Sequence, residues 1–313
     1  MRAATYSAYS QDNSTLGVTE QPDPKVAPGT VLIEVGGAGV NPVDWKVMAG
    51  YLDGLMDAVF PVIPGWDVAG VVKAVGPDTP EFAVGDEVYA YARKEVVHGG
   101  TFAELVAVPA ESVARKPSSL DLVQAGAVPL AGLTALKALQ STGISPDGSG
   151  KTVLIHGGAG GVGGFAVQIA RAAGARVIAT ASEGNHDYLR SLGAEPVTYG
   201  AGLPDRVRAL APDGVDAVVD FVGGVEQDTL AVLAGDGQHA SIADAEVTEH
   251  GGEYLWVRPS HDGLVFLAEL IDAGKVTVEV AQTFGLDGVG AAFDLSRAGH
   301  TRGKLVIVPT DRG

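Results

Sequence analysis

A run of glycines is the strongest chemical signal in the sequence. Residues 157–164 read GGAGGVGG and contain the pattern G-x-G-x-x-G, which begins at Gly158. Glycine lets backbone N–H groups come close to a pyrophosphate, and the N-terminus of a following helix favours its negative charge. An apolar run precedes this turn and a helical run follows it, which predicts a dinucleotide site. The residues expected to hold the pyrophosphate are Gly158, Gly160, Gly161, Val162 and Gly163.

The end of the next strand-like run indicates which dinucleotide binds. An NAD site usually has Asp or Glu there, because a carboxylate accepts hydrogen bonds from the ribose 2′-hydroxyl. This run ends with Thr180, Ala181 and Ser182, which leave room and hydroxyl donors for a 2′-phosphate, so NADP is favoured. Glu183, one position later, leaves NAD as the alternative. Further donors nearby in the sequence are His186, Arg190 and Tyr199, although the first two also fit an ordinary solvent-exposed helix face.

Metal and thiol chemistry find no support in the residue types. The chain has no cysteine, which excludes disulfides, thiolate nucleophiles and cysteine-ligated zinc. Its seven histidines show no H-x-x-x-H spacing, so we expect no metal site. No tyrosine is followed four positions later by lysine, which excludes the Tyr-x-x-x-Lys chemistry of the short-chain reductases.

Length and composition predict two lobes that would position these residues. The chain has 313 residues, of which 46% are apolar and 19% charged, and this is more than one hydrophobic core usually fills. Residues 1–121 are rich in strand-like runs with short turns, typical of a compact antiparallel barrel. Residues 122–258 alternate between strand and helix, which predicts an α/β domain with a doubly wound parallel sheet. Residues 259–313 form a tail that either caps this sheet or returns to the first lobe.

Individual elements follow from the same patterns. We expect strands at residues 30–35, 68–75, 152–156, 176–181, 196–199, 217–221, 238–242 and 304–308, with an alternating run at 276–280. We expect helices at residues 163–173, 187–192, 225–233 and 264–273.

Charge argues against several classes of partner. With 21 Lys and Arg against 38 Asp and Glu, the formal net charge is −17, which repels nucleic acids and anionic membrane surfaces. An RNA-binding role is therefore disfavoured. Residues 152–170 are apolar, but the glycines among them are unsuited to a membrane-spanning helix. The opening residues contain no apolar segment typical of a secretory signal, so we expect a cytoplasmic protein.

A series of short motifs runs through nearly the whole chain. They are GVNPVDWK at 39–46, PGWDVAG at 64–70, VGDEV at 84–88, GGTFAE at 99–104, PLAGLTA at 129–135, DFVGG at 220–224 and GHTRGK at 299–304. In their order and spacing, together with the glycine turn, they resemble the medium-chain dehydrogenase/reductase superfamily. The resemblance is strongest to its zinc-independent, zeta-crystallin-like branch of quinone oxidoreductases.

The resemblance implies a GroES-like barrel, a Rossmann domain, a tail that returns to the barrel, and an active site in the cleft between the domains. It also implies a homodimer. Zinc-dependent relatives carry Cys where this chain has Asn41 and a His-Glu pair where it has Trp66 and Asp67. They also carry a four-cysteine structural site. The resemblance therefore implies catalysis without zinc.

Roles for individual residues come from the same resemblance. Asn41 and Thr134 would lie beside the nicotinamide, and Tyr51 would donate to the substrate carbonyl. The residues expected to line the nicotinamide ribose of the cofactor are Phe221, Val222, Ser241 and Ala243. Arg302 and Lys304 would return to the cleft from the tail. Asp44 and Trp66 are expected in the substrate cleft.

Structural alternatives remain open for several of these residues. Asp44 also fits an ion pair with Lys46 that holds the fold, and Tyr51 and Trp66 also fit as cleft walls. Asp67 fits a bond to the backbone of its own turn. Glu104 fits a cap or an ion pair within the barrel.

The expected reaction follows from the missing zinc. Without a Lewis acid, the easier task is hydride transfer from NADPH to an electron-poor carbon of an enone or quinone. The developing enolate then needs hydrogen-bond donors, and Tyr51 or water would protonate it. The alternatives are a reductase of enoyl thioesters or polyketide intermediates, and a non-catalytic NADPH-binding sensor or structural protein.

Overall fold

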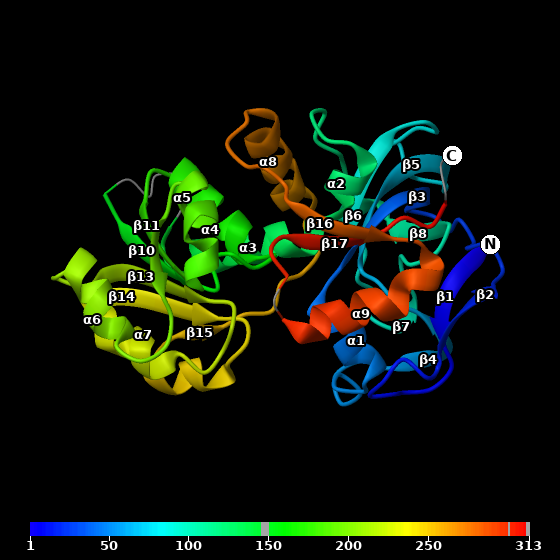
Figure 1. Ribbon diagram of the computed structural model, residues 1–313. Helices are drawn as coiled ribbons and strands as arrows, with labels where there is room; N and C mark the ends of the chain where they lie inside the picture. The colour runs from blue at the N-terminus through cyan, green and yellow to red at the C-terminus, as the bar shows by residue number, and fades with distance from the viewer. Residues whose placement is uncertain (145–149, 300, 311–313) are drawn as a thin grey trace. The chain divides into compact units, whose positions relative to one another are not determined.

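The structure of the protein, a computed structural model, describes residues 1–144, 150–299 and 301–310 (Figure 1). The chain divides into two units. The first comprises Met1–Leu133, Arg258–Asp272 and Val278–Gly313, and the second comprises Thr134–Val257 and Ala273–Thr277. Helix α3 (Pro129–Ser141) contains the division between Leu133 and Thr134. His300, within the closing motif, lies outside the described residues.

Antiparallel strands dominate the first unit. Its strands are β1 (Arg2–Tyr6), β2 (Leu16–Glu20), β3 (Thr30–Val40), β4 (Ala58–Ile63), β5 (Asp67–Val75), β6 (Glu87–Tyr91), β7 (Val97–Gly99), β8 (Leu105–Pro109), β9 (Val113–Arg115), β16 (Val280–Phe284) and β17 (Lys304–Ile307). Its helices are α1 (Pro42–Met48), α2 (Leu122–Gly126), α8 (His261–Asp272) and α9 (Val289–Ala298), with short 3₁₀ turns at Ala110–Ser112 and Leu286–Gly288. One sheet has the order β2-β1-β4-β7, and the other β16-β17-β3-β5-β6-β9 with β8 also paired to β3.

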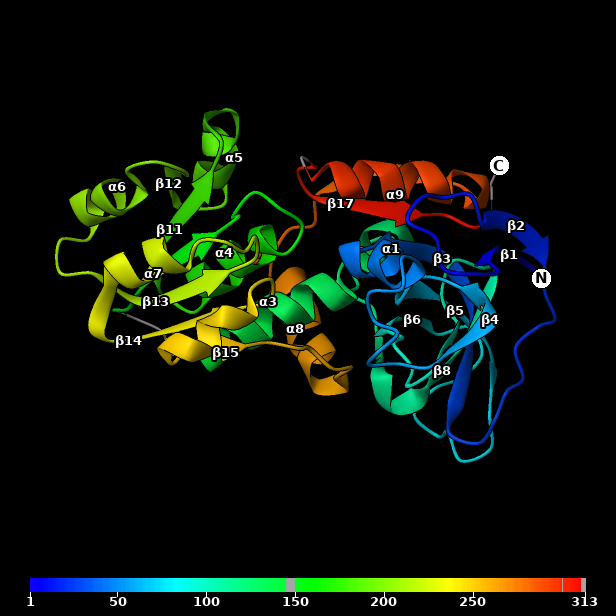
Figure 2. The same ribbon diagram turned by 90° about the horizontal axis from the view of Figure 1, so that it is seen from below.

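Glycines in the second half of strand β3 let the backbone of helix α2 pack against the backbone of the strand. A Cβ atom on Gly37 would lie 2.6 Å from the carbonyl oxygen of Leu122, and one on Gly39 would lie 2.7 Å from that of Gly126. Helix α2 therefore packs directly on β3, and this explains why residues 122–133 belong to the first unit, although the composition changes near residue 122. Helix α9 lies beside β17, β3 and α1 (Figure 2).

The tail returns to this unit through its last strand. β17 pairs antiparallel with β3, with Leu305 opposite Val40 and Ile307 opposite Ala38. β16 pairs parallel with β17 but begins at Val280, so the alternating run at 276–280 precedes the strand rather than forming it. Residues 273–277 of the tail belong to the second unit.

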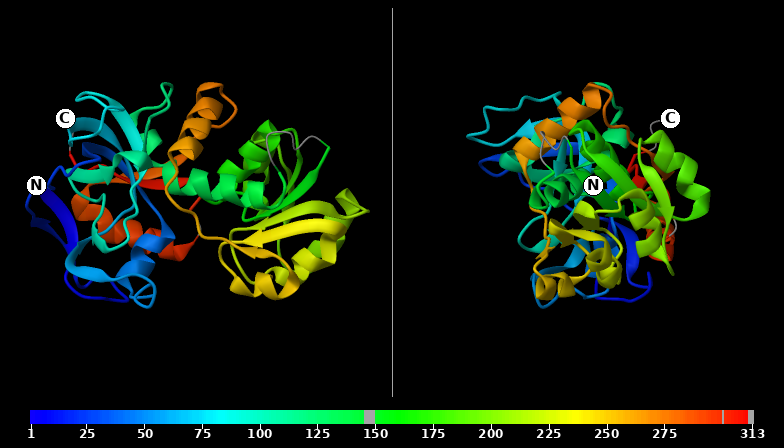
Figure 3. Two further views of the ribbon diagram at one scale, coloured as in Figure 1. Left: turned by 180° about the vertical axis from the view of Figure 1, so that it is seen from behind. Right: turned by 90° about the vertical axis from the view of Figure 1, so that its left-hand side faces the viewer.

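The second unit is a parallel sheet with helices between its strands. Its strands are β10 (Thr152–His156), β11 (Arg176–Ala181), β12 (Glu195–Thr198), β13 (Val215–Asp220), β14 (Leu233–Ser241) and β15 (Glu253–Tyr254). Its helices are α4 (Gly163–Ala172), α5 (His186–Ser191), α6 (Leu203–Leu210) and α7 (Glu226–Val232), with 3₁₀ turns at Glu183–Asn185 and Ala245–His250. The six strands have the order β12-β11-β10-β13-β14-β15 and lie side by side in one layer (Figure 3).

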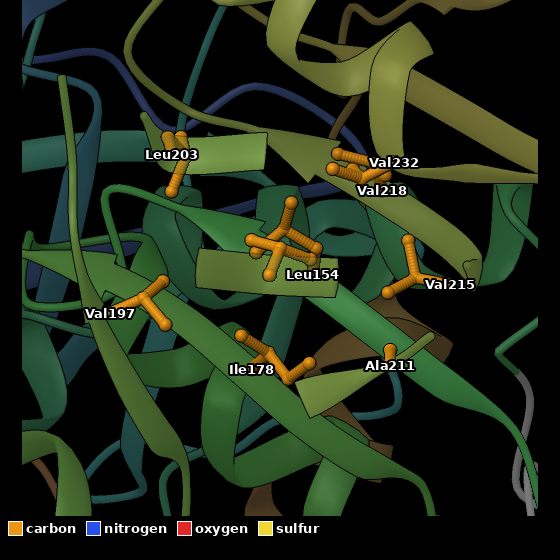
Figure 4. Close-up of a cluster of buried hydrophobic side chains, with 9 residues drawn as sticks. Leu154, Ile178, Val197, Leu203, Ala211, Val215, Val218 and Val232 are labelled. Atoms are coloured by element: carbon orange, nitrogen blue, oxygen red, sulfur yellow. The ribbon is translucent and has the colours of Figure 1, made fainter. Parts of the chain in front are cut away.

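Apolar residues on neighbouring strands build the core of this sheet. Leu154 of β10 lies opposite Ile178 of β11, and both are fully buried in one cluster with residues of α6 and α7 (Figure 4). Such continuous apolar runs are typical of parallel strands covered on both faces. Helix α6 was not among the expected elements because its sequence, LPDRVRAL, is short and carries three charged residues. No helix in the described ranges is long and apolar enough to cross a membrane.

Candidate active site

The glycine turn joins β10 to α4 at the carboxyl end of the parallel sheet, and its geometry requires glycine. Gly157 has a φ of +73°, in the left-handed region that favours glycine. A Cβ atom on Gly163 would lie 2.1 Å from the carbonyl oxygen of Gly157, so no side chain fits there. The turn thus keeps its backbone open at the N-terminus of a ten-residue helix.

Backbone amides in this turn remain free for an anion. The amides of Gly158 and Gly160 donate to Thr180 O and Gly157 O. Within the part of the chain that the structure describes, the amides of Gly161, Val162 and Gly163 have no acceptor. Three free amides at a helix N-terminus form a cradle that fits the pyrophosphate of a dinucleotide.

Thr180 holds this turn in place. Its side chain is buried, and its Oγ1 accepts a hydrogen bond of 3.0 Å from the amide of Gly157. The hydroxyl is therefore committed to the turn rather than exposed at the strand end. Ser182, two residues later, is exposed, and its Oγ accepts a hydrogen bond from Asn185 Nδ2.

The carboxyl ends of β11 and β12 bring several of the expected donors together. These strands pair in parallel with Ala181 opposite Thr198, so Ser182 and Tyr199 follow adjacent strand ends. Tyr199 is 58% exposed, and His186 Nε2 lies 3.5 Å from Thr198 Oγ1. Arg190 instead pairs with Asp187 on the surface of α5.

Arg206 is a residue of this edge that the sequence did not indicate. Its guanidinium donates to the carbonyl oxygens of Thr198, Gly200 and Ala201. It therefore fixes the loop that carries Tyr199. Its position on a short, polar helix gave no sequence signal of this role.

Asp220 organises the ends of the two strands on the other side of the turn. Its Oδ1 accepts hydrogen bonds from the amides of Val222 and Gly223, and its Oδ2 accepts one of 2.7 Å from Ser241 Oγ. Ser241 Oγ in turn accepts from the amides of Ala243 and Asp244. The exposed Val222 and Ala243 and the half-buried Phe221 are thus held in defined loops at the carboxyl edge.

A second cluster lies in the first unit and consists of Asn41, Asp67 and the buried Lys304. Lys304 Nζ, at the start of β17, donates to Asn41 Oδ1 at 2.5 Å and to Val40 O at 3.1 Å, and lies 4.0 Å from Asp67 Oδ2. Asn41 Nδ2 donates to Asp67 Oδ2 at 2.8 Å. All three side chains are buried. Asn41 therefore connects a buried cation to a buried anion.

Asp67 bonds to distant groups rather than to its own turn. Its Oδ1 accepts a hydrogen bond of 2.7 Å from the amide of Leu130, 63 residues away, and its Oδ2 accepts from Asn41. Burial raises the pKa of Asp67 to about 6, although Lys304 and Asn41 act to lower it. Burial also lowers the pKa of Lys304, against the effect of Asp67 and Asp44.

Asp44 does not form the expected ion pair with Lys46. Its Oδ2 accepts a hydrogen bond of 2.8 Å from the backbone amide of Asn41, which caps α1, and the carboxyl group is buried. Lys46 lies over the ring of Trp45, at 5.7 Å from its centroid. Residues two positions apart on a helix do not face each other, and this separates the Asp44 carboxyl from Lys46. Burial raises the pKa of Asp44 to about 8.

The remaining expected residues have varied surroundings. Tyr51 is 61% exposed and its hydroxyl donates to Gln11 Oε1 at 3.2 Å. Trp66 is buried with its ring tilted against Tyr91. Thr134 is buried in α3, and Arg302 forms an exposed ion pair with Glu279.

Two further findings concern polar and charged side chains elsewhere in the described residues. Glu104 accepts a hydrogen bond of 2.8 Å from the amide of Arg2, consistent with a structural role. Across the described residues, no group of three or more His, Asp or Glu side chains is placed to hold a metal ion.

Comparisons with known proteins agree with this architecture. A family model described as the alcohol dehydrogenase GroES-like domain matches residues 27–118, and one described as zinc-binding dehydrogenase matches residues 192–307. The chloroplast envelope quinone oxidoreductase homolog of Arabidopsis thaliana is 30% identical, over 99% of this chain and 98% of its own. The NADPH-dependent alkenal/one oxidoreductase of the same plant is 35% identical, over 91% of this chain and 74% of its own.

Solved structures show the same fold. The quinone oxidoreductase from Coxiella burnetii is similar with a TM-score of 0.86 and 32% identity, covering 99% of each chain. Both units of this chain, the barrel with its returning tail and the parallel sheet with its glycine turn, are therefore explained by one family. The chain is an oxidoreductase that belongs to the medium-chain dehydrogenase/reductase superfamily, in its quinone oxidoreductase branch.

Proposed function

We propose that this enzyme reduces a quinone or an α,β-unsaturated carbonyl compound with NADPH, without a catalytic metal. The observation that carries the proposal is the ammonium group of Lys304, which lies against Asn41 and Asp67. Zinc-dependent relatives carry Cys at the position of Asn41 and a His-Glu pair at the positions of Trp66 and Asp67. A buried lysine already supplies the positive charge that Asp67 requires, so binding a divalent cation beside it would bring two cations together.

The names of the relatives support the substrate class. A quinone oxidoreductase homolog and an alkenal/one oxidoreductase both align with most of this chain. Quinones and enones share an electron-poor carbon conjugated to a carbonyl group. Reduction of such a carbon needs no metal to lower a hydroxyl pKa, and the negative charge that develops on oxygen needs only hydrogen-bond donors.

The choice of NADPH rests on the edge formed by β11 and β12. β11 ends at Ala181, and the next residue, Ser182, is not acidic. Ser182, His186 and Tyr199 follow adjacent strand ends as potential donors to a 2′-phosphate. The free amides of Gly161, Val162 and Gly163 would hold the pyrophosphate. When bound, NADPH supplies the hydride for the reduction.

Residues of this chain would then position the reactants. Asp220 and Ser241 fix the loops at Val222 and Ala243, which we propose to line the nicotinamide ribose. Tyr51 has an exposed hydroxyl whose present acceptor is another side chain, so it is free to turn toward a substrate oxygen. Either this hydroxyl or water would donate to the developing enolate. The homodimer and the cytoplasmic location stay predictions.

Initial rates of NADPH and NADH oxidation with ortho-quinones, para-quinones and short enones test the proposal. We expect turnover with at least one of these acceptors and higher kcat/KM with NADPH than with NADH. Turnover that requires added zinc would contradict catalysis without a metal. A higher kcat/KM with NADH than with NADPH would contradict the choice of NADPH. Tight NADPH binding without turnover on any acceptor would instead favour a thioester substrate or the non-catalytic alternative.

A further inference from the structure

The connection between β6 and β7 carries two adjacent cations that no carboxylate neutralises. It begins after Tyr91 and includes Arg93 and Lys94. Neither side chain forms an ion pair with an Asp or Glu of the described ranges, and the exposed Glu95, next in the sequence, pairs with neither. In a chain with 38 acidic residues against 21 basic ones, two consecutive cations without a carboxylate partner require an explanation.

Partial burial distinguishes these two cations from most others that lack a carboxylate partner. Every other described lysine and arginine either forms an ion pair or is exposed, with the exception of Arg206. The guanidinium of Arg206 donates to three backbone carbonyl oxygens. Lys94 Nζ has one such acceptor, Gly99 O at 2.6 Å. Arg93 has no acceptor within the part of the chain that the structure describes, and its guanidinium lies 6.0 Å from the centroid of the Tyr91 ring.

Most hydrogen-bond donors of this pair are unused by the described protein. A guanidinium has five N–H donors and an ammonium has three. Those of Arg93 have no acceptor there, and Lys94 uses one of its three. Partial burial also removes some of the water that would otherwise solvate the two charges. Burial accordingly lowers the pKa of Lys94, and no carboxylate acts to raise it. An anion bound by both side chains would supply the missing charge and the missing acceptors.

Contacts with the protein orient both side chains before any ligand binds. The bond from Lys94 Nζ to Gly99 O spans the connection and fixes the ammonium against the end of β7. Arg93 lies over the Tyr91 ring, and a guanidinium on an aromatic ring keeps the N–H groups at its edge available. These N–H groups form the fork that binds a carboxylate or a phosphate through two oxygens. Side chains that are already oriented lose less conformational entropy on binding.

Strand pairing places this connection next to residues expected at the site. Tyr91 of β6 lies opposite Asp67 of β5. The amide of Ala92 donates to Trp66 O at 2.6 Å, and the rings of Trp66 and Tyr91 have centroids 6.2 Å apart. Arg93 therefore follows directly after a backbone bond to Trp66, for which a place in the substrate cleft is expected. The two cations thus lie beside the residues that we expect to surround the acceptor.

We propose that Arg93 and Lys94 bind an anionic group of the electron acceptor, a carboxylate or a phosphate that is remote from the carbon receiving the hydride. This inference rests on the proposed function and narrows its substrate class. The net charge of −17 repels anions at long range, so selection for such an acceptor must come from local cations. The anion has two possible sources: an enone or quinone with its own carboxylate, and an enoyl thioester whose carrier bears phosphate.

A matched pair of acceptors tests the carboxylate. One is an enone with a carboxylate several carbons away from the double bond, and the other is its methyl ester, so the reacting groups are the same. We expect the wild-type kcat/KM to be at least about tenfold higher with the acid, mainly through a lower KM. Arg93→Met should lose most of this preference, because methionine has neither the charge nor the N–H donors.

Further variants separate loss of the anion site from loss of the fold. Arg93→Lys retains the charge but not the fork of donors, so it should keep part of the preference. Lys94→Gln removes the charge but keeps an N–H donor for Gly99 O, and it should also lower the preference. Lys25→Met removes one charge at an exposed position of the first unit and should leave the ratio of acid to ester unchanged. Melting temperatures show which variants are folded.

A second pair of acceptors tests the phosphate. Crotonyl-coenzyme A carries phosphate groups, whereas the crotonyl thioester of pantetheine carries none. If the enzyme prefers the coenzyme A thioester and Arg93→Met does not, while the acid and its methyl ester react alike, the site binds a phosphate-bearing carrier. A preference confined to the acid assigns the site to the carboxylate of a free acceptor. Equal kcat/KM values within both pairs would overturn the proposal.

Binding measured without turnover separates this inference from the proposed function. The saturated keto acid and its methyl ester have no double bond to reduce, and calorimetry gives their Kd values; coenzyme A and pantetheine serve the same purpose for the phosphate. We expect the anionic member of one pair to bind at least about tenfold more tightly, and Arg93→Met to remove most of this difference. Selective anion binding without turnover of any acceptor would refute the proposed function and leave the anion site. Turnover of quinones or enones without selectivity in either pair would refute the anion site alone.

Discussion

The ammonium of Lys304 donates a hydrogen bond to the side-chain oxygen of Asn41, from a position 263 residues further along the chain. The antiparallel pairing of β17 with β3 brings the two together, because Leu305 lies opposite Val40. The returning tail thus supplies a charged group to the centre of the barrel. Asn41, Asp67 and Lys304 consequently act as one hydrogen-bonded unit.

Replacement of Lys304 by methionine should destabilise the protein. The change keeps much of the side-chain volume but leaves Asp67 as a buried carboxylate without its cation, which costs about 3–5 kcal/mol in comparable cases. Urea denaturation at pH 8 measures the loss. Lys25→Met, at an exposed position, should change the free energy of unfolding little. A double variant with Asp67→Asn should recover part of the stability, and failure to recover any would contradict the assigned pairing.

Stability should depend on pH through Asp44. Its pKa in the folded state is raised from 3.8 to about 8, so between these values the folded protein holds a proton that the unfolded chain has lost. This contribution to stability is complete below about pH 4 and is lost as pH rises toward 8. The free energy of unfolding of Asp44→Asn, measured relative to wild type, should therefore increase with pH by up to about 1.4 kcal/mol per unit in this window. A difference that stays constant from pH 5 to 8 would show that Asp44 is already ionised.

Gly163→Ala should abolish NADPH binding while the first unit keeps its fold. The added Cβ would lie 2.1 Å from the carbonyl oxygen of Gly157, so the turn must move and its free amides lose their arrangement. Fluorescence titration with NADPH measures the effect. Gly235→Ala is the matched control, because its Cβ would have no atom within 4 Å and it lies exposed in β14. Wild-type affinity in Gly163→Ala would exclude this turn as the pyrophosphate site.

Ser182→Asp should shift the cofactor preference from NADPH toward NADH. A carboxylate at the end of β11 repels a 2′-phosphate and accepts hydrogen bonds from a 2′-hydroxyl. We expect the ratio of kcat/KM for NADPH to that for NADH to fall by at least about tenfold, which corresponds to about 1.4 kcal/mol. Ser191→Asp adds the same charge at an exposed position on α5 and should leave the ratio unchanged.

Tyr51→Phe should lower kcat more than it weakens NADPH binding, because the hydroxyl is proposed to contact the substrate and not the cofactor. Steady-state kinetics and a cofactor titration on the same preparation separate the two effects. Tyr9→Phe is a useful control, since that hydroxyl donates to Asp53 in the neighbouring loop. Equal turnover in wild type and Tyr51→Phe would leave Tyr51 as a wall residue.

Local patterns made the parallel sheet predictable. The glycine turn, the apolar strands and most helices of the second unit depend on neighbours in sequence. The expected bounds of these elements lie within a few residues of the observed ones, except for β14. That strand begins at Leu233, five residues earlier than expected. The free amides of Gly161, Val162 and Gly163 follow from the same local motif.

Contacts between distant segments could not be predicted in this way. The sequence suggested Lys46 as the partner of Asp44 because it is two positions away, and a turn bond for Asp67 because it follows Pro64-Gly65. For Asp67, the groups that face the carboxyl come from β17 and from the start of α3. For Asp44, the partner is the backbone amide of Asn41, in the cap of its own helix.

Lys304 follows the whole second unit in the sequence, and this sets the order in which its cluster can form. Synthesis proceeds from the N-terminus, so the barrel strands and the whole second unit leave the ribosome before this lysine does. Until β17 docks on β3, Asp67 must remain hydrated or protonated, and Asn41 lacks its fixed orientation. The Asn41–Asp67–Lys304 cluster is therefore completed only after the whole second unit has been made, so a nascent chain with a folded parallel sheet still lacks this buried ion pair.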